Sequence, residues 1–326
     1  MITAAYIYVE KFAGLRTGDA ERLTHVNLSF ALVKDGKGSV DHWSNTEIIR
    51  ELVRNKGKLK VILAVGGWGA GGFSPAVATE ESRELFAQSL VDIVDDFGLD
   101  GIDMDWEYPC DSVAGIEASP ADKPNYTAFI QLLRDKLGND KIITMAAGGM
   151  QSCADNLEIP KLVELMDFFN IMTYDMCPWD YVSYHPSLYP SDFTKNNNAD
   201  TVIRIYEKAG VPRNKLVIGA AFYGRVYRDV DGLNAPSGIP GFSGGYTDTL
   251  NLAEAASGVQ YDEKAETAYA YNAKDRIFLT FDNSRSLKAK IDYVQSTGLA
   301  GLMFWEYSQD TDDSTLIKTI FHHKNS

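Results

Sequence analysis

The sequence predicts an α/β protein built as a (β/α)₈ barrel, also called a TIM barrel. Eight short apolar segments, rich in β-branched and aromatic residues, alternate with longer segments of helical character. Near-continuous apolar runs are typical of parallel strands that helices cover on both faces. A chain of 326 residues is long enough to form one such domain. The eight expected strands are 4–9, 25–33, 60–65, 101–106, 142–147, 168–173, 216–221 and 301–305.

Helix signals lie between these strands. The apolar residues between 79 and 98 recur on one helix face, Thr79 suits the N-cap, and Gly98 suits the position after the last turn. Residues 126–136 and 200–209 are expected to form further helices. The alternative is an open doubly wound sheet, which normally has a glycine-rich phosphate turn after its first strand. That region contains only isolated glycines, so the barrel is favoured.

The interval between the seventh and eighth expected strands is much the longest. It contains a stretch rich in Gly, Pro and Ser at 232–246, followed by a β-like stretch at 261–281. We therefore expect a small α+β lobe at residues 229–280, inserted at the rim of a single catalytic domain that spans 1–326.

Composition and charge restrict the partners. The chain has 31 Lys plus Arg against 45 Asp plus Glu, a net charge of −14, and this acidity argues against nucleic acid as a partner. No apolar run reaches the length of about 18 residues that a membrane span needs. The chain has no signal peptide, so we expect an extracellular protein if it is a trimmed mature form and a cytoplasmic one otherwise.

The three cysteines, Cys110, Cys153 and Cys177, lack the spacing of a disulfide scaffold or a metal site. We expect free thiols, although one bridge with one leftover thiol stays possible. The five histidines lie away from the strand-end segments in the sequence, so neither a metal nor another cofactor is expected.

The most informative segment is residues 100–109, with the sequence DGIDMDWEYP. Because side chains alternate along a strand, Asp103, Asp105 and Glu107 share one face, and in a barrel one face is the interior. Like charges in a low dielectric cannot all ionise, so at least one carboxyl should keep its proton near neutral pH. Glu107 lies at the carboxyl end, where barrel active sites open, and is the expected general acid.

Other interpretations of this acidic face are a solvent-exposed strand face, a structural cluster, or a Mg²⁺ or Ca²⁺ site. The apolar flanks argue against exposure, and a single strand cannot surround a cation. Catalysis is therefore favoured over metal binding. Asp100 has the opposite parity and follows a turn, so we expect it to be structural.

Asp100, Asp103, Asp105 and Glu107 together resemble the DxxDxDxE signature of the glycoside hydrolase family 18 chitinases. Further segments resemble motifs of that family in the same order, over roughly residues 4 to 310. They are AVGG at 64–67, MTYD at 172–175, FYGR at 222–225 and LMFW at 302–305.

The resemblance implies a retaining, substrate-assisted mechanism, an exception to the usual two-carboxylate scheme. Glu107 would protonate the glycosidic oxygen, and the 2-acetamido oxygen of the substrate would attack its own anomeric carbon to give an oxazolinium ion. Asp105 would hold the acetamido N–H and share a proton with Asp103. Tyr174 would donate to the acetamido oxygen.

Aromatic rings beside polar groups suit a sugar, whose C–H faces stack on rings while its hydroxyls form hydrogen bonds. By resemblance, Trp305 forms the floor of the −1 subsite. Trp106 is expected in the core, and Trp43 is left open. The expected substrate-binding residues are Trp305, Asp175, Met172, Tyr223, Arg225, Trp68, Trp179, Gly67 and Tyr6.

The leading hypothesis is a monomeric chitinase that cleaves β-1,4 bonds between N-acetylglucosamine units of chitin or chitooligosaccharides. One alternative is an endo-β-N-acetylglucosaminidase acting on N-glycan cores. Another is a non-catalytic chitin-binding lectin, which would typically lack the glutamate at position 107. A metal-dependent hydrolase would need clustered histidines.

Ala64 stands where the family usually has a serine that supports the inner aspartate. We predict that hydrolysis survives this difference but that its pH dependence is displaced. The Ala64→Ser variant should therefore shift the pH profile of the hydrolysis rate relative to wild type. Identical profiles for the two proteins would contradict the prediction.

Overall fold

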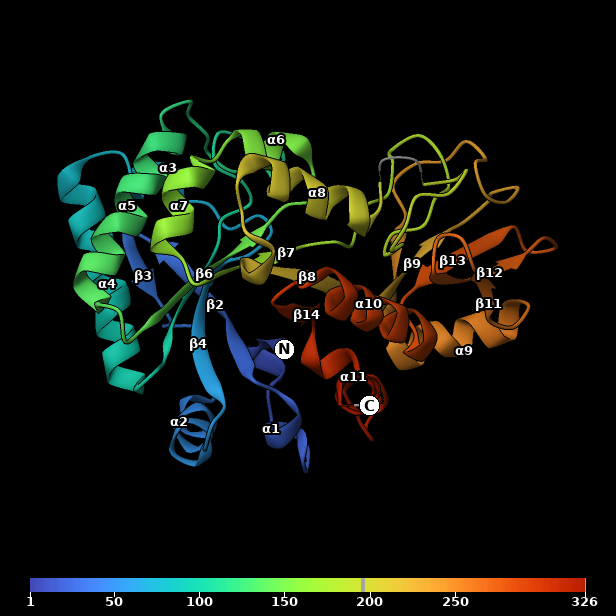
Figure 1. The fold of residues 1–326 in the computed structure, drawn as a ribbon, viewed down its shortest axis with the longest axis horizontal. Coiled ribbons are helices and arrows are strands. Elements are labelled where there is room, and N and C mark those ends of the chain that lie inside the picture. The colour runs from blue at the N-terminus through green and yellow to red at the C-terminus, as the bar shows by residue number, and fades with distance from the viewer. Residues whose placement is uncertain (195–196, 326) are drawn as a thin grey trace.

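The computed structural model describes residues 1–194 and 197–325. Its centre is a closed barrel of parallel strands with helices around it (Figure 1), so the predicted (β/α)₈ fold is confirmed. The strand order is β1-β14-β8-β7-β6-β5-β4-β2, and pairing of β1 with β2 closes the barrel. These strands are β1 (Ile2–Tyr8), β2 (His25–Lys34), β4 (Lys60–Gly66), β5 (Gly101–Asp105), β6 (Ile142–Ala147), β7 (Phe168–Ile171), β8 (Leu216–Ala221) and β14 (Gly301–Trp305).

The helices begin and end where local chemistry predicts. α4 (Glu80–Phe97) starts with a capping box between Thr79 and Ser82, which satisfies backbone N–H groups of its first turn. It ends at Gly98, whose φ of 70° lies in the left-handed region that glycine adopts without penalty. The other helices around the barrel are α1 (Asp19–Arg22), α2 (Thr46–Asn55), α3 (Phe73–Ala76), α5 (Asp122–Leu137), α6 (Gln151–Asp155), α7 (Ile159–Leu165), α8 (Ala199–Ala209), α10 (Ser284–Thr297) and α11 (Thr315–Lys324).

Three barrel strands are shorter at their carboxyl ends than the sequence predicted, and the first of them, β1, stops at Tyr8 rather than 9. β5 stops at Asp105 rather than 106, and β7 stops at Ile171 rather than 173. At β7 the chain turns because the Thr173 backbone N–H bonds back to the Ile171 carbonyl at 2.8 Å. Glu107 therefore lies just beyond the strand, where the barrel opens.

A second sheet lies to one side of the barrel (Figure 1). It is antiparallel, has the strand order β10-β9-β13-β12-β11, and packs against α9 (Tyr246–Ala256). The sheet includes a strand that precedes the expected lobe limits of 229–280, and those limits remain a prediction. Its strands are β9 (Tyr223–Tyr227), β10 (Gly241–Gly245), β11 (Gln260–Asp262), β12 (Thr267–Asn272) and β13 (Ile277–Phe281).

The apolar core consists of a small cluster around Tyr184, Tyr227 and Phe278 and of two larger parts. The larger lies between the strands and the helices, where Trp106 stacks on Phe73 with ring centroids 5.2 Å apart, as expected for a core residue. Trp43, whose place the sequence left open, is also buried there against Phe97. The smaller part fills the barrel interior and includes Ala64. None of the helices within residues 1–194 and 197–325 combines the length and apolar character needed to cross a bilayer.

A buried ion pair joins the lobe to the barrel. Asp282 follows β13, and its Oδ2 lies 2.5 Å from Lys290 Nζ on α10, with both side chains fully buried. The same carboxylate accepts from the Ala221 backbone N–H at 3.0 Å and from Ser286 Oγ at 2.7 Å. Burial lowers the pKa of Lys290, and the Asp282 charge opposes this effect. These bonds tie the last strand of the lobe to β8.

Removing one partner of this pair should be costly because it leaves an unpaired buried charge. We predict that Lys290→Met lowers the free energy of unfolding by about 3–5 kcal/mol, measured by denaturant titration. The double variant Lys290→Met/Asp282→Leu should recover part of this loss. A single variant as stable as wild type would show that the pair does not hold the two units together.

Candidate active site

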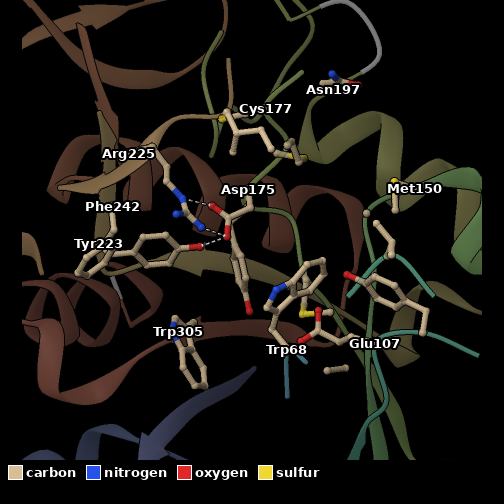
Figure 2. A pocket seen from close by; sticks show the side chains of 18 of the residues that line it. Trp68, Glu107, Met150, Asp175, Cys177, Asn197, Tyr223, Arg225, Phe242 and Trp305 are labelled. Carbon is tan, nitrogen blue, oxygen red and sulfur yellow. Dashed lines mark hydrogen bonds and ion pairs between the residues drawn. The ribbon is translucent and has the colours of Figure 1, made fainter. Parts of the chain in front are cut away.

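A cavity of about 830 Å³ opens beside the carboxyl ends of the barrel strands and is walled on one side by the lobe. Figure 2 shows its side chains converging from β9, β10 and β14 and from the loops that follow barrel strands. Eleven of the thirteen residues that the sequence marked for the site line this cavity. They are Tyr6, Trp68, Asp105, Glu107, Met172, Tyr174, Asp175, Trp179, Tyr223, Arg225 and Trp305.

The other two residues do not line the cavity. Gly67, which the sequence marked for substrate binding, is not among the lining residues, and its backbone N–H bonds to the Asp105 carbonyl at 2.8 Å. A Cβ at position 67 would lie 2.7 Å from the ring of Phe30, so only glycine fits there. Asp103 lies below the cavity, fully buried inside the barrel.

Asp103 is held by three neutral donors from three other strands. Tyr6 OH donates to Oδ2 at 2.8 Å, while Thr144 Oγ1 and Asn170 Nδ2 donate to Oδ1 at 2.5 and 3.0 Å. Burial raises the pKa of Asp103, and these hydrogen bonds limit the rise. Ala64 pairs with Asp103 in the β4–β5 register, but its methyl group donates nothing. The donors to this carboxylate therefore come from elsewhere in the barrel.

Asp105 and Glu107, the next two carboxyls toward the cavity, both have a raised pKa. Burial, followed by the charges of Glu107 and Asp103, raises the pKa of Asp105 well above its ordinary value. Burial also raises the pKa of Glu107 to about 7, opposed by a hydrogen bond from Tyr108 and aided by the charge of Asp175. Among the described residues, no group donates to Asp105 Oδ1. The expectation that one carboxyl keeps its proton near neutral pH agrees with these values.

The opposite wall is built around Asp175. Arg225 Nε and Nη2 each lie 2.6 Å from one of its oxygens, and Tyr223 OH donates to Oδ2 at 2.7 Å (Figure 2). Burial alone would raise the pKa of Asp175, but His185 and the Arg225 guanidinium hold it well below its ordinary value. This residue follows β7, whereas Arg225 and Tyr223 belong to β9, so the bonds link barrel to lobe.

His185 corrects a prediction, since the sequence placed all histidines away from the strand-end motifs. Its Nδ1 accepts the Asp175 backbone N–H at 3.3 Å, and its ring lies 5.2 Å from that of Tyr223. The long loop after β7 folds back, which sequence spacing does not reveal. Burial lowers the pKa of His185, and the neighbouring Asp175 carboxylate opposes this effect.

Trp305 ends β14 and forms the aromatic floor of the cavity. Its ring stacks on Phe30 with centroids 5.5 Å apart and an angle of 16°, and lies 6.0 Å from the ring of Tyr6. The sequence analysis missed Phe30, although an aromatic residue late in an expected strand was an available signal. Other lining residues that it missed include Tyr108, Met150, Met176, Cys177, Ile239 and Phe242.

The cysteines and Asp100 were also considered in the sequence analysis. All three cysteines are free thiols, and burial raises the pKa of Cys177, which lines the cavity, to about 12. Asp100 lies outside the cavity and pairs with Lys56 at 2.6 Å, in agreement with a structural role. Over the part of the chain that the structure describes, no group of three or more His, Cys, Asp or Glu side chains is arranged to hold a metal ion.

These groups define what the cavity can do. It offers a carboxyl that gains or loses a proton near pH 7, a neighbouring carboxyl with an uncommitted oxygen, and a flat aromatic floor. Together these groups can transfer a proton to a ring-shaped substrate and bind its hydrogen-bonding groups.

Known proteins resemble this chain over most of its length. The model of glycosyl hydrolases family 18 matches residues 4–310. Chitinase A1 of Niallia circulans is 34% identical, and the match covers 82% of this chain and 43% of the relative. Chitinase 1 of Aphanocladium album is 30% identical, and the match covers 82% of this chain and 66% of the relative. The chain thus spans less than two-thirds of either relative. A solved family 18 N-acetylglucosaminidase from Paenibacillus barengoltzii matches with a TM-score of 0.92, 34% identity and 99% coverage of both chains.

The raised pKa of Glu107 predicts a pH-dependent cost to stability. Between its ordinary value and about 7, the folded chain keeps a proton that the unfolded chain has lost, so the cost grows as pH rises. Replacing Glu107 by Gln removes the titration. Relative to wild type, Glu107→Gln should gain about 3 kcal/mol in free energy of unfolding as pH rises past 7, and little at pH 4. Denaturant titrations at both pH values measure this, and a pH-independent difference would contradict it.

Proposed function

The chain belongs to the family 18 glycosyl hydrolases, and we propose that it is a glycosidase that cleaves β-1,4 bonds between N-acetylglucosamine units in chitin or chitooligosaccharides. Relatives named as chitinases support the substrate class. The reaction type is inferred from a single observation, the pair of buried carboxyls. Glu107 has a pKa of about 7, and Asp105 has an oxygen without a donor in the described structure.

In the proposed reaction Glu107 is the general acid. Its carboxyl proton passes to the glycosidic oxygen as the bond to the anomeric carbon breaks. The acetamido oxygen of the same sugar forms the new bond to that carbon. This step gives an oxazolinium ion, in which the acetamido nitrogen keeps its proton. Water then adds to the anomeric carbon and returns a proton to Glu107. The configuration is retained after two displacements, and no enzyme nucleophile takes part.

Asp105 and Tyr174 support the internal attack. The uncommitted Asp105 oxygen accepts the acetamido N–H, which orients the group and stabilises the positive charge that develops on it. The Tyr174 hydroxyl lies 3.9 Å from Met303 Sδ, a weak acceptor, and so is available to donate to the acetamido oxygen. Asp103 stays below them as a fixed support held by Tyr6 and two other donors.

The remaining lining residues bind the sugar. Trp305 stacks under the ring in the −1 subsite, where Asp175 contacts sugar hydroxyls, and Met172 contributes apolar surface. Trp68 and Trp179 are large rings that are 65% and 68% exposed, which suits stacking with neighbouring sugar units. Tyr223 and Arg225 hold the Asp175 carboxylate in place.

A second candidate is N-acetylglucosaminidase activity. It is favoured by the match over 99% of both chains to a solved N-acetylglucosaminidase, a protein of this chain's own length. An endo-β-N-acetylglucosaminidase acting on N-glycan cores uses related chemistry and is a further alternative. The presence of both Glu107 and Asp105 disfavours a non-catalytic lectin.

Product analysis separates these activities. Wild type and Glu107→Gln are incubated with an N-acetylglucosamine tetramer and, separately, with a glycoprotein, and the products are identified by mass spectrometry. We predict cleavage of the tetramer by wild type and a loss of at least about 10²-fold in the variant, as for removal of a general acid.

The products distinguish the candidates. Dimers as the main product indicate a chitinase, whereas monomers released one at a time indicate an N-acetylglucosaminidase. Glycan release without tetramer cleavage indicates the endoglycosidase. If neither substrate is cut, the proposed mechanism is wrong.

A further inference from the structure

Asp175 has a backbone conformation that its neighbours must hold in place. Its φ of 54° lies in the left-handed region, which residues other than glycine seldom adopt, although aspartate is among those that tolerate it. The turn at this residue aims the carboxylate at Arg225 and Tyr223 on β9. The direction of this carboxylate therefore depends on what fixes the turn.

The backbone N–H at this turn donates to a histidine. His185 Nδ1 lies 3.3 Å from the Asp175 backbone nitrogen, and within residues 1–194 and 197–325 no other group accepts that N–H. The distance from the same ring nitrogen to Asp175 Oδ1 is longer, at 3.6 Å. Because Nδ1 accepts a hydrogen bond, it carries a lone pair, and the ring proton is on Nε2.

His185 is itself held at both of its backbone groups. Its N–H donates to Thr280 Oγ1 at 3.2 Å, and its carbonyl accepts the Met176 N–H at 3.2 Å. Thr280 lies on β13, where it pairs with Arg225 across the ladder. His185 thus joins the chain that leaves β7 at Asp175 to the lobe strands that bind the Asp175 carboxylate.

The other ring nitrogen does not stabilise the fold. The His185 side chain is fully buried, and its Nε2 has no hydrogen-bond partner among the described residues. A buried donor without a partner lowers stability. The ring lies 5.2 Å from that of Tyr223, and the charges that act on it are those of Asp175, Arg225 and Asp282. A polar side chain at position 185 therefore serves the wall around Asp175 more than the core.

We infer that His185 is a positioning residue of the active site, whose Nδ1 fixes the left-handed turn at Asp175 and with it the direction of the carboxylate that contacts the sugar. It acts through Asp175 rather than on the substrate, since it is not among the residues that line the cavity. This inference rests on the proposed function, because it takes the same substrate and the same role for Asp175.

Substitutions at position 185 test the hydrogen-bond acceptor. His185→Leu removes it and should lower kcat/KM for the N-acetylglucosamine tetramer about tenfold, with an unfolding midpoint near that of wild type. His185→Asn brings an amide oxygen close to the place of Nδ1 and should keep at least about a third of the wild-type value. His25→Leu is the matched control, because His25 begins β2 at the opposite end of the barrel, and it should leave kcat/KM unchanged.

A double-variant cycle identifies the residue through which His185 acts. In an Asp175→Ala background, His185→Leu should change calorimetric binding of the tetramer and kcat/KM by less than about twofold, because the carboxylate that it positions is gone. A full tenfold loss in that background would overturn the inference. So would a His185→Leu protein as active as wild type, or a His185→Asn protein as impaired as His185→Leu.

Nitrogen NMR of the labelled chain gives a readout that does not need catalysis. The His185 ring signals, assigned by their disappearance in His185→Asn, should show a proton on Nε2 and none on Nδ1. Hydrogen exchange at the Asp175 amide should be faster in His185→Leu than in wild type or His185→Asn. A proton on Nδ1, or equal exchange in all three proteins, would overturn the inference. If wild type cleaves no oligomer, the proposed function fails, and these spectra still decide whether His185 holds the turn.

Discussion

The structure depends on one electrostatic constraint, which is that a single barrel strand and its end carry three buried carboxyls in a column. Asp103, Asp105 and Glu107 share a face by the alternation of the strand, and barrel closure removes water from all three. They cannot all be charged in such a medium. The barrel surrounds each of the three carboxyls with a different number of hydrogen-bond donors.

At the bottom, three hydrogen-bond donors surround Asp103 and make its charge tolerable. At the top, Glu107 has few donors and a pKa of about 7, so it exchanges its proton near neutral pH. Asp105, between them, feels both neighbours and keeps an oxygen that nothing in the described structure satisfies. A buried polar group without a partner is costly, and such groups persist where a ligand satisfies them.

The lobe matters because two sets of charged contacts bind it to the barrel. Asp175 bonds to Arg225 and Tyr223 across the cavity, and Asp282 bonds to Lys290 behind it. The first set builds the wall that faces Glu107, and the second holds the last lobe strand against β8. With the lobe fixed in this way, its exposed side chains Ile239 and Phe242 occupy set positions in the wall of the cavity.

Sequence alone determined the alternation of strands and helices, the shared face of Asp103, Asp105 and Glu107, and the strand-end motifs, since each follows from periods and short spacings. Only the tertiary structure decided that Thr144 supports Asp103, that His185 lies against Asp175, that Gly67 packs under Phe30 and that lobe residues enter the cavity. These contacts join residues far apart in the chain. Their geometry depends on the register of the barrel strands and on the paths of the loops. Packing of the whole molecule sets both, so no short stretch of sequence predicts these contacts.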